Sequence, residues 1–323
     1  MLKKSTFHFL PAEIFTFIYI FITSIVILVF KHDLKASKEL LEPRLFIVLG
    51  VFFFAFIDSF KRIWILRFLR YVYLAILLSY WYPETYEINK TLPNLDFLLA
   101  NWEQHLFGFQ PALVFSAYFN QHWFSELMNM GYLAYYPIIV ITGMYFYLKD
   151  SKYFKIFFFS VIFAFYLYYL IYIFFPTAGP QYYFIANGLA DVEKGIFHHI
   201  GTYFQYNHVL VSNHSDTGFF INLVETTQLA GEQPTAAFPS SHVGITTLIM
   251  IHIYKKRYYK VFTSLVPVYM ALVAATVYIQ AHYLIDVFAG LITAFLFYFA
   301  SIKVYKKLFL SQVMNIQGHA KCL

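Results

Sequence analysis

The feature that most constrains this chain is a series of long apolar segments separated by short polar ones. The sequence of 323 residues is 60% hydrophobic and only 12% charged, a balance that soluble domains of this length do not normally show. A helix needs about 20 apolar residues to cross a membrane, and fewer where aromatic and basic residues anchor its ends. The sequence therefore predicts an all-α, polytopic transmembrane helix bundle in a single domain, 1–323. We expect about eight spans, at 14–30, 46–60, 66–81, 127–148, 154–175, 243–254, 261–279 and 283–304.

The positively charged residues indicate how these spans are oriented. The positive-inside rule assigns loops rich in Lys and Arg to the cytoplasm. Such residues gather at 61–62, 149–155, 255–260 and 303–307. The basic loop at 31–44 goes against this alternation and weakens the orientation of the first two spans only. The loops at 83–126 and 176–238 are therefore expected to face outward, and the mixed pattern at 95–102 predicts a helix lying in the membrane interface. Because the basic residues stand beside apolar runs, the net charge of +6 does not indicate a nucleic-acid partner.

A histidine and an aspartate four residues apart stand where an outer loop meets an apolar segment. These are His282 and Asp286, and on a helix this spacing places both side chains on one face. An aspartate that accepts a hydrogen bond from one ring nitrogen leaves the other nitrogen with an exposed lone pair, and it stabilises the positive ring that forms after attack. The pair is therefore a candidate nucleophile and its orienting carboxylate. An ordinary structural His–Asp pair inside the bundle would have the same spacing.

A second histidine follows a motif that starts helices. His242 comes directly after Pro239, Ser240 and Ser241, and proline and serine are favoured at helix N-termini. The free N–H groups and the dipole of a helix N-terminus favour an anion. We expect a phosphate to be held beside His242, although a helix cap with an interfacial histidine is the simpler alternative.

A third polar segment lies on the same predicted outer face. At 175–182 proline and glycine break a helix directly after an apolar span. Three such segments at three helix ends can converge on one site.

Together these motifs resemble a known family. The segments 237–244, with the sequence Ala-Phe-Pro-Ser-Ser-His-Val-Gly, and 281–287, with the sequence Ala-His-Tyr-Leu-Ile-Asp-Val, resemble the type 2 phosphatidic acid phosphatase (PAP2) superfamily. With 175–180 they are most similar to its aureobasidin-resistance branch of inositol phosphorylceramide synthases. The resemblance covers about 174–296. It implies a PAP2-like catalytic core at 151–310, preceded by N-terminal spans and the interfacial helix at 1–150.

The resemblance also implies roles for individual residues. His282 would be the nucleophile that takes the phosphoryl group, Asp286 would orient it, and His242 would protonate the leaving group. No metal and no cofactor is expected, and a partner subunit is left open. The residues expected to contact substrate are Gly179, Gln181, Ser240, Ser241 and Tyr283.

One departure from the family indicates the substrate class. Phosphatases of the superfamily carry basic residues in the first motif and before the third, whereas 172–180 and 275–281 contain none. A phosphate monoester approaches two negative charges and is usually bound by several cations, whereas a lipid phosphodiester carries one charge. We therefore expect a membrane phosphotransferase with a phosphohistidine intermediate. The donor would be a phosphatidylinositol-like lipid and the acceptor a ceramide-like lipid, both implied by the resemblance alone.

Two other functions remain open at this point. One is a lipid phosphate phosphatase acting on phosphatidic acid or undecaprenyl pyrophosphate, and the other is a transporter or scaffold without enzymatic activity. We expect the site on the extracytoplasmic face, in a bacterial inner membrane. The outer loop also contains several histidines and aspartates whose spacing matches no tight metal-ligand pattern, so solvated side chains are expected there. They are His198, His199, His208, His214, Asp191 and Asp216.

Overall fold

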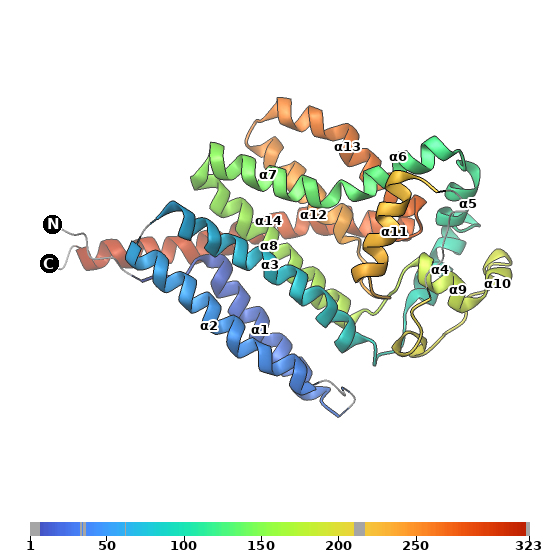
Figure 1. Cartoon of the computed structure of the whole chain (residues 1–323), viewed down its shortest axis with the longest axis horizontal. Helices are drawn as coiled ribbons and strands as arrows, with labels where there is room; N and C mark the ends of the chain where they lie inside the picture. Colours follow the sequence, from blue (N-terminus) through green and yellow to red (C-terminus); the bar gives the residue numbers. More distant parts are fainter. Residues whose placement is uncertain (1–6, 33, 35–36, 62, 210–216, 321–323) are drawn as a thin grey trace.

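The protein is a bundle of α-helices joined by loops (Figure 1). The computed structural model describes residues 7–32, 34, 37–61, 63–209 and 217–320, and this described part contains no strand. The first seven helices are α1 (Pro11–Val29), α2 (Ser37–Lys61), α3 (Trp64–Asn89), α4 (Asp96–Phe107), α5 (Pro111–Tyr118), α6 (His122–Leu133) and α7 (Tyr135–Lys149). They are followed by α8 (Ser151–Phe174), α9 (Pro180–Asn187), α10 (Leu189–Glu193), the 3-10 turn η1 (Tyr203–Gln205), α11 (Phe219–Gly231), α12 (Ser241–Lys255), α13 (Tyr259–Tyr278) and α14 (Leu284–Ala320). The predicted all-helical class is confirmed.

Each predicted span is helical, but not each helix could cross a membrane alone. Within the described residues, five helices are long and apolar enough: α1, α2, α8, α13 and α14. The pair α6 and α7 raises this to six if it counts as one span, bent by 43°. Pro137 lies in the first turn of α7, where it removes a hydrogen-bond donor next to the bend. The predicted segments 66–81 and 243–254 lie in α3 and α12, which do not pass the same test of length and apolarity.

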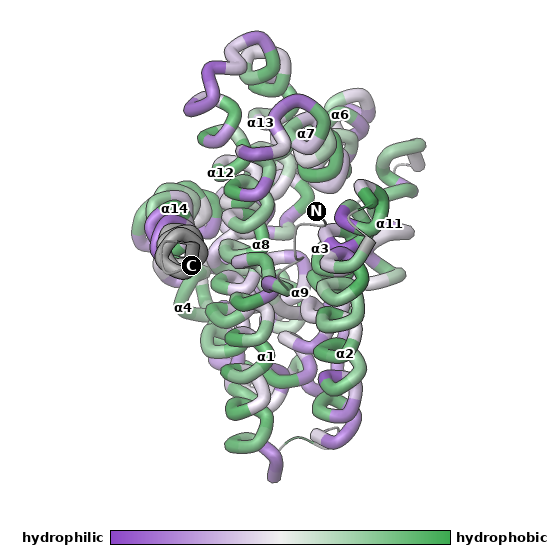
Figure 2. Tube along the Cα trace, turned by 90° about the vertical axis from the view of Figure 1, so that its left-hand side faces the viewer, coloured by the Kyte–Doolittle hydropathy of each residue, from purple (hydrophilic) through white to green (hydrophobic). Residues whose placement is uncertain are grey.

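The helix α8 forms the centre of the bundle. It is apolar on all sides, as expected for a buried helix, and it packs against α1, α3, α7, α12 and α14. In its most apolar stretch 72% of residues are buried, against 28% in α2 and in α13. The helices α1, α2 and α14 leave many large apolar side chains exposed, and in Figure 2 α1 and α2 are coloured as hydrophobic along most of their length. The chain is therefore an integral membrane protein.

Two buried ion-pair clusters hold the N-terminal helices together. Arg70 of α3 pairs with Glu13 of α1 and with Asp58 of α2. Arg44 of α2 pairs with Glu84 of α3 and also donates to the Ile20 carbonyl and the Thr23 hydroxyl of α1. Each arginine thus satisfies groups on two other helices.

The close crossing of α12 and α14 brings together the starts of these two helices. A Cβ on Gly290 would lie 2.6 Å from the Ser240 carbonyl oxygen, so only glycine allows this approach. Both helices run from here toward basic residues, at 255–257 in α12 and at 303–307 in α14. The His242 and His282 motifs therefore lie at the opposite ends of α12 and α14 from these basic residues.

Candidate active site

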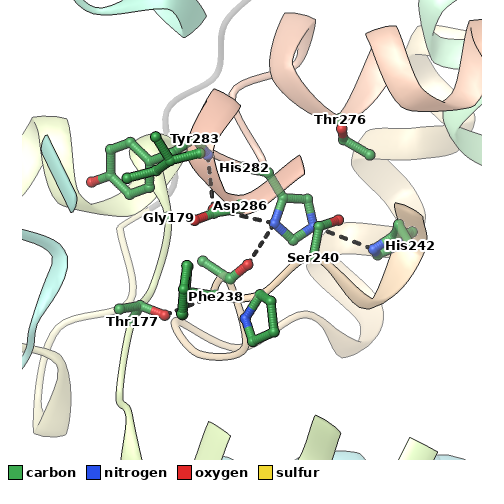
Figure 3. A network of polar contacts seen from close by, with 12 residues as sticks. Thr177, Gly179, Phe238, Ser240, His242, Thr276, His282, Tyr283 and Asp286 are labelled. Carbon is green, nitrogen blue, oxygen red and sulfur yellow. Dashed lines mark hydrogen bonds and ion pairs between the residues drawn. The ribbon is translucent and has the colours of Figure 1, made fainter. Parts of the chain in front are cut away.

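Three loops that are far apart in sequence are joined by backbone hydrogen bonds (Figure 3). Thr177 accepts from Ala237 N–H at 3.1 Å and, through its hydroxyl, from Phe238 N–H at 3.0 Å. Gln181 N–H donates to the Gln280 carbonyl at 2.8 Å. The loop after α8, the loop before α12 and the turn between α13 and α14 therefore form one polar layer.

The two imidazoles of this layer face each other. The Nε2 atom of His282 lies 3.4 Å from Nδ1 of His242, and Nδ1 of His282 lies 2.8 Å from the Ala237 carbonyl oxygen. A carbonyl only accepts, so Nδ1 of His282 must carry the proton and Nε2 keeps its lone pair. His242 then donates from Nδ1 toward that lone pair. A nitrogen with a lone pair and an N–H donor therefore stand side by side.

Asp286 acts on the turn more directly than on the ring. His282 lies outside α14, and Oδ2 of Asp286 accepts from Tyr283 N–H at 2.8 Å while remaining 3.5 Å from Nδ1 of His282. The sequence predicted that the carboxylate itself would take the ring hydrogen bond. The Ala237 carbonyl takes it instead, because Asp286 sits in the first helical turn, where free N–H groups attract its oxygen. Asp286 remains close enough to stabilise a charged ring.

Two tyrosines hold the other imidazole. The ring of His242 stacks on Tyr132, with centroids 4.8 Å apart, and leans against Tyr135 at 4.2 Å. Both come from the bend between α6 and α7. Aromatic contacts at these distances restrict the ring to a narrow range of orientations. The bend therefore positions the proposed proton donor.

Acidic residues from α4 hold the two neighbouring helix starts. Asp96 accepts from the backbone N–H groups of Ala178 and Gly179 at 2.6 and 2.8 Å, and Glu103 accepts from Ile285 N–H at 3.0 Å. Burial raises the pKa of Asp96, and it raises the pKa of Glu103 to about 8. Because these buried carboxyl groups bind backbone N–H groups of the loops, their role is to position those loops.

A further polar network approaches His282 from α11. Glu232 accepts from Nε2 of Gln181 at 2.8 Å, and Gln228 donates to Oε1 of Gln181 at 3.1 Å. Burial raises the pKa of Glu232, and its charge is close enough to His282 to raise the pKa of that imidazole. Glu232 also interacts electrostatically with the side chains of four tyrosines: Tyr82, Tyr132, Tyr136 and Tyr182. The site is thus lined by hydroxyl, amide and carboxyl groups.

A family model described as the PAP2 superfamily matches residues 98–300, which include all three loops and both imidazoles. The chain belongs to the PAP2 superfamily. Membership identifies an enzyme that acts on phosphate esters of lipid-like substrates. No curated protein and no solved structure matches the chain. The family match begins within α4, so it includes Glu103, Glu232 and the tyrosine bend that hold this PAP2 site together.

The residues expected to contact substrate in the PAP2 site have different surroundings. The N–H of Gly179 already donates to Asp96. The backbone φ of Gly179 is 89°, a conformation that favours glycine. A Cβ at this position would also lie 2.5 Å from the Ala281 carbonyl oxygen. Ser240 is the N-cap of α12, as its place before the helix indicated, and its hydroxyl accepts from Val243 N–H. Figure 3 shows the Tyr283 ring pointing away from His282. Ser241 is half-buried beside His242, and Gln181 belongs to the Glu232 network.

The described histidine side chains of the outer loop have partners other than His242 and His282. His198 pairs with Asp191 at 3.1 Å on the surface, and His208 contacts the Tyr86 hydroxyl. In the described part of the chain no three or more of His, Cys, Asp and Glu gather as metal ligands would. His214 and Asp216 lie outside the described residues.

Sequence reasoning missed several groups that position the PAP2 site. Asp96 and Glu232 are acidic residues in segments that are poor in lysine and arginine and are predicted to face outward. An acidic residue without a nearby lysine or arginine, in a segment predicted to lie on the same face as the two histidines, could have indicated such a role. The Ala237 carbonyl and the stacking of Tyr132 and Tyr135 left no such signal, because both arise from chain segments that meet only in the fold.

Proposed function

We propose that the protein is a membrane phosphotransferase that moves a phospho-head group from a glycerophospholipid to a ceramide-type lipid through a phosphohistidine on His282. The observation that carries the proposal is the lack of cations around the histidine pair. Among the described residues, no lysine or arginine forms a hydrogen bond or ion pair with His242, His282 or Asp286. A monoester with nearly two charges would be poorly bound here, whereas a diester carries one. This favours transfer from a lipid diester over phosphatase action.

The lining of the site supports a polyol head group such as phosphoinositol. Glu232 and Gln181 form a hydrogen-bonded pair beside His282, and carboxyl and amide groups can accept from several hydroxyls at once. An electrostatically negative group next to a phosphate is unfavourable unless it binds a neutral, donor-rich part of the substrate. A ring of hydroxyls fits that requirement. These features support a likeness to the aureobasidin-resistance branch of the PAP2 superfamily.

The first step forms the phosphohistidine. Nε2 of His282 attacks the phosphorus of the donor lipid, and the bond between phosphorus and the diacylglycerol oxygen breaks. His242, protonated on both ring nitrogens at this stage, gives its Nδ1 proton to that oxygen and becomes neutral, so neutral diacylglycerol leaves. The ring of His282, still donating from Nδ1 to the Ala237 carbonyl, is stabilised in its positive form by Asp286 at 3.5 Å.

The second step returns the enzyme to its starting state. The hydroxyl of the acceptor lipid attacks phosphorus, and His242 takes its proton as general base. The bond between phosphorus and Nε2 breaks, and the imidazole of His282 is restored. Water must stay out during this step, and the buried rings of Tyr132 and Tyr135 cover the His242 imidazole. The proposed site opens to the extracytoplasmic face, opposite the basic loops, in a bacterial inner membrane.

Trapping the intermediate tests the proposal. Full-length protein is incubated with phosphatidylinositol labelled at phosphorus, without acceptor, and label stable to base and labile to acid is expected on the peptide that contains His282. Adding ceramide should move the label into a lipid product. In His282→Ala the turnover should fall by about 10⁴-fold or more, while His198→Ala serves as the matched control.

Three results would contradict the proposal. Release of inorganic phosphate without transfer to ceramide would indicate a phosphatase. Normal cellular function of a folded His282→Ala variant would indicate a transporter or scaffold. Label on another residue would reassign the nucleophile.

A further inference from the structure

Two cavities meet at the short helix α5, outside the contacts of the histidine pair. The first has a volume of about 570 Å³ and lies between α4, α5 and α10, and the second, of about 450 Å³, lies between α5, α13 and α14. Phe109 and Val114 line both. Volumes of this size are typical of sites for small molecules. Figure 1 shows α4, α5, α9 and α10 gathered at one end of the bundle, away from both termini.

The two cavities differ in chemistry. The second is lined by apolar residues of α13 and α14 such as Val273 and Leu284, with Phe115 and Tyr118 from α5. The first has a mixed lining, in which amides and hydroxyls stand beside apolar residues such as Leu113 and Ala117, and among its described lining residues Glu193 alone is charged. Its polar residues are Gln104, Gln110, Ser116, Asn120, Ser125 and Tyr278. A polar basin joined to an apolar groove matches an amphipathic lipid with an uncharged head.

One residue that lines the polar cavity has a buried acceptor without a hydrogen bond. Gln110 is 4% exposed, and its Nε2 donates to the Ala100 carbonyl at 3.0 Å and to Gln104 at 3.2 Å. These bonds fix the orientation of the amide and leave Oε1 buried without a hydrogen bond to any described residue. A buried acceptor without a donor is costly. The missing donor would be a hydroxyl or an amide N–H of the bound molecule, which the acceptor-only oxygens of a phosphate diester cannot supply.

The polar cavity is connected to the histidine turn. Ser116, in its lining, accepts from Nε2 of Gln280 at 3.1 Å. Gln280 is two residues before His282, and its carbonyl accepts from Gln181 N–H. In addition, Ala112 of α5 belongs to the same apolar cluster as Val243, which follows His242 in sequence. A ligand at α5 would therefore lie next to both imidazole-bearing segments.

We propose that these two cavities bind the acceptor lipid alcohol, with its head at Gln110 and a chain in the groove between α13 and α14. The identification of the bound lipid as the acceptor rests on the proposed function. The presence of a lipid-binding site at α5 rests on the two cavities alone. Diacylglycerol, the other uncharged lipid of the reaction, has a single hydroxyl. A basin with three amides and several hydroxyls suits an acceptor that has both amide and hydroxyl groups.

The test uses a ceramide that carries a photoreactive group and an alkyne tag, added to the full chain in lipid nanodiscs. Label is expected on α5 and on the facing residues of α13. In Val114→Trp, which fills the opening shared by the cavities, labelling should fall about tenfold. Val140→Trp on α7 is the matched control, since Val140 is also exposed, at 65% against 46% for Val114, and its labelling should not change.

Competition separates the possible occupants. Excess ceramide should remove the label, whereas a diacylglycerol whose hydroxyl is methylated, and which has no donor, should not. Equal competition by free diacylglycerol would assign the site to the leaving lipid and overturn the proposal. Equal labelling of Val114→Trp and Val140→Trp, or label spread over all lipid-facing helices, would also overturn it.

Kinetics separate this inference from the proposed function. Val114→Trp should raise the KM for ceramide about tenfold and leave formation of the phosphohistidine unchanged. Suppose that the native protein forms no phosphohistidine, while Val114→Trp still lowers the labelling of α5. The proposed function would then be rejected and the lipid site retained. Phosphohistidine formation with an unchanged KM in Val114→Trp would reject the lipid site alone.

Discussion

The N-terminal bundle, formed by α1, α2 and α3, and the PAP2 site both bury acidic side chains, but these side chains have different hydrogen-bonding partners in the two regions. In the N-terminal bundle each buried acid meets an arginine, as Glu13 and Asp58 meet Arg70 and Glu84 meets Arg44. In the site the buried acids meet backbone N–H groups and amides, as Asp96 does at Ala178 and Gly179. Paired charges cancel locally and join helices, whereas acids bound to N–H groups hold loops.

This difference has a consequence for substrate binding. The N–H groups of Ala178 and Gly179 are the kind of donors that attract phosphate, yet the Asp96 carboxylate occupies them. Arginines that could bind a phosphate lie in the other region, where acids neutralise them. The site therefore depends on its two imidazoles, which suits a substrate of low charge.

The largest effect on stability is expected from breaking a buried pair. Arg70→Met leaves Glu13 without its arginine and Asp58 with only the partly exposed Arg67, and the loss of one partner of a buried pair costs about 3–5 kcal/mol. Thermal unfolding in detergent should show a large drop in melting temperature. Arg67→Met is the control on the same helix, because Arg67 is 46% exposed and lies 3.5 Å from Asp58, and such exposed pairs contribute about 0–1 kcal/mol. Equal drops in both variants would contradict the contrast between the regions.

The next largest effect is a dependence of folding stability on pH through His282, which lies in the turn between α13 and α14. Burial lowers the pKa of His282 to about 4, although the Ala237 carbonyl and Glu232 act to raise it. The unfolded imidazole has a pKa of about 6.5, so the unfolded chain binds more protons between these values. The stability from neutral His282 is complete above about pH 6.5 and is lost as pH falls toward 4, by on the order of 3 kcal/mol.

Melting temperatures between pH 4 and pH 7 measure this contribution. His282→Gln has no titrating ring, so the difference in melting temperature between the native protein and this variant should narrow as pH falls. A difference independent of pH would show that His282 is not held neutral by burial.

A smaller effect is expected from Asp96→Asn. The amide would place N–H groups against the N–H of Ala178 or Gly179, leaving a buried donor unpaired at a cost of about 1–3 kcal/mol. The melting temperature and the transfer rate should both fall, because the Gly179 loop supports the His282 turn. Glu39→Gln, at an exposed position of α2 outside both cavities, is the control. Unchanged activity in Asp96→Asn would mean that this loop does not position the turn.

The smallest effect is expected from His198→Ala in the histidine-rich loop. The exposed pair of His198 with Asp191 contacts neither imidazole of the site. Turnover and melting temperature should stay as in the native protein, with or without a chelator. A loss of turnover restored by a divalent cation would reveal a metal role for this loop.

Particular residues show how far the sequence could lead. The spacing and neighbours of His242, His282 and Asp286 are enough to indicate one site, and the position of Ser240 indicates a helix start that the structure confirms. The ring partner of His282 could not be found in this way. It is a backbone carbonyl 45 residues away, and every residue carries a carbonyl, so composition gives no signal.

The sequence by itself determined that this chain is helical, enters a membrane and carries two histidines and an aspartate of a PAP2 pattern. These properties follow from apolar length and from short motifs, which are local. Only the tertiary structure decided which groups surround the imidazoles, because those come from the α6–α7 bend, the loop before α12 and the residue that follows α11, which meet only when the helices pack. It also decided where a lipid can bind, since cavities exist only between packed helices.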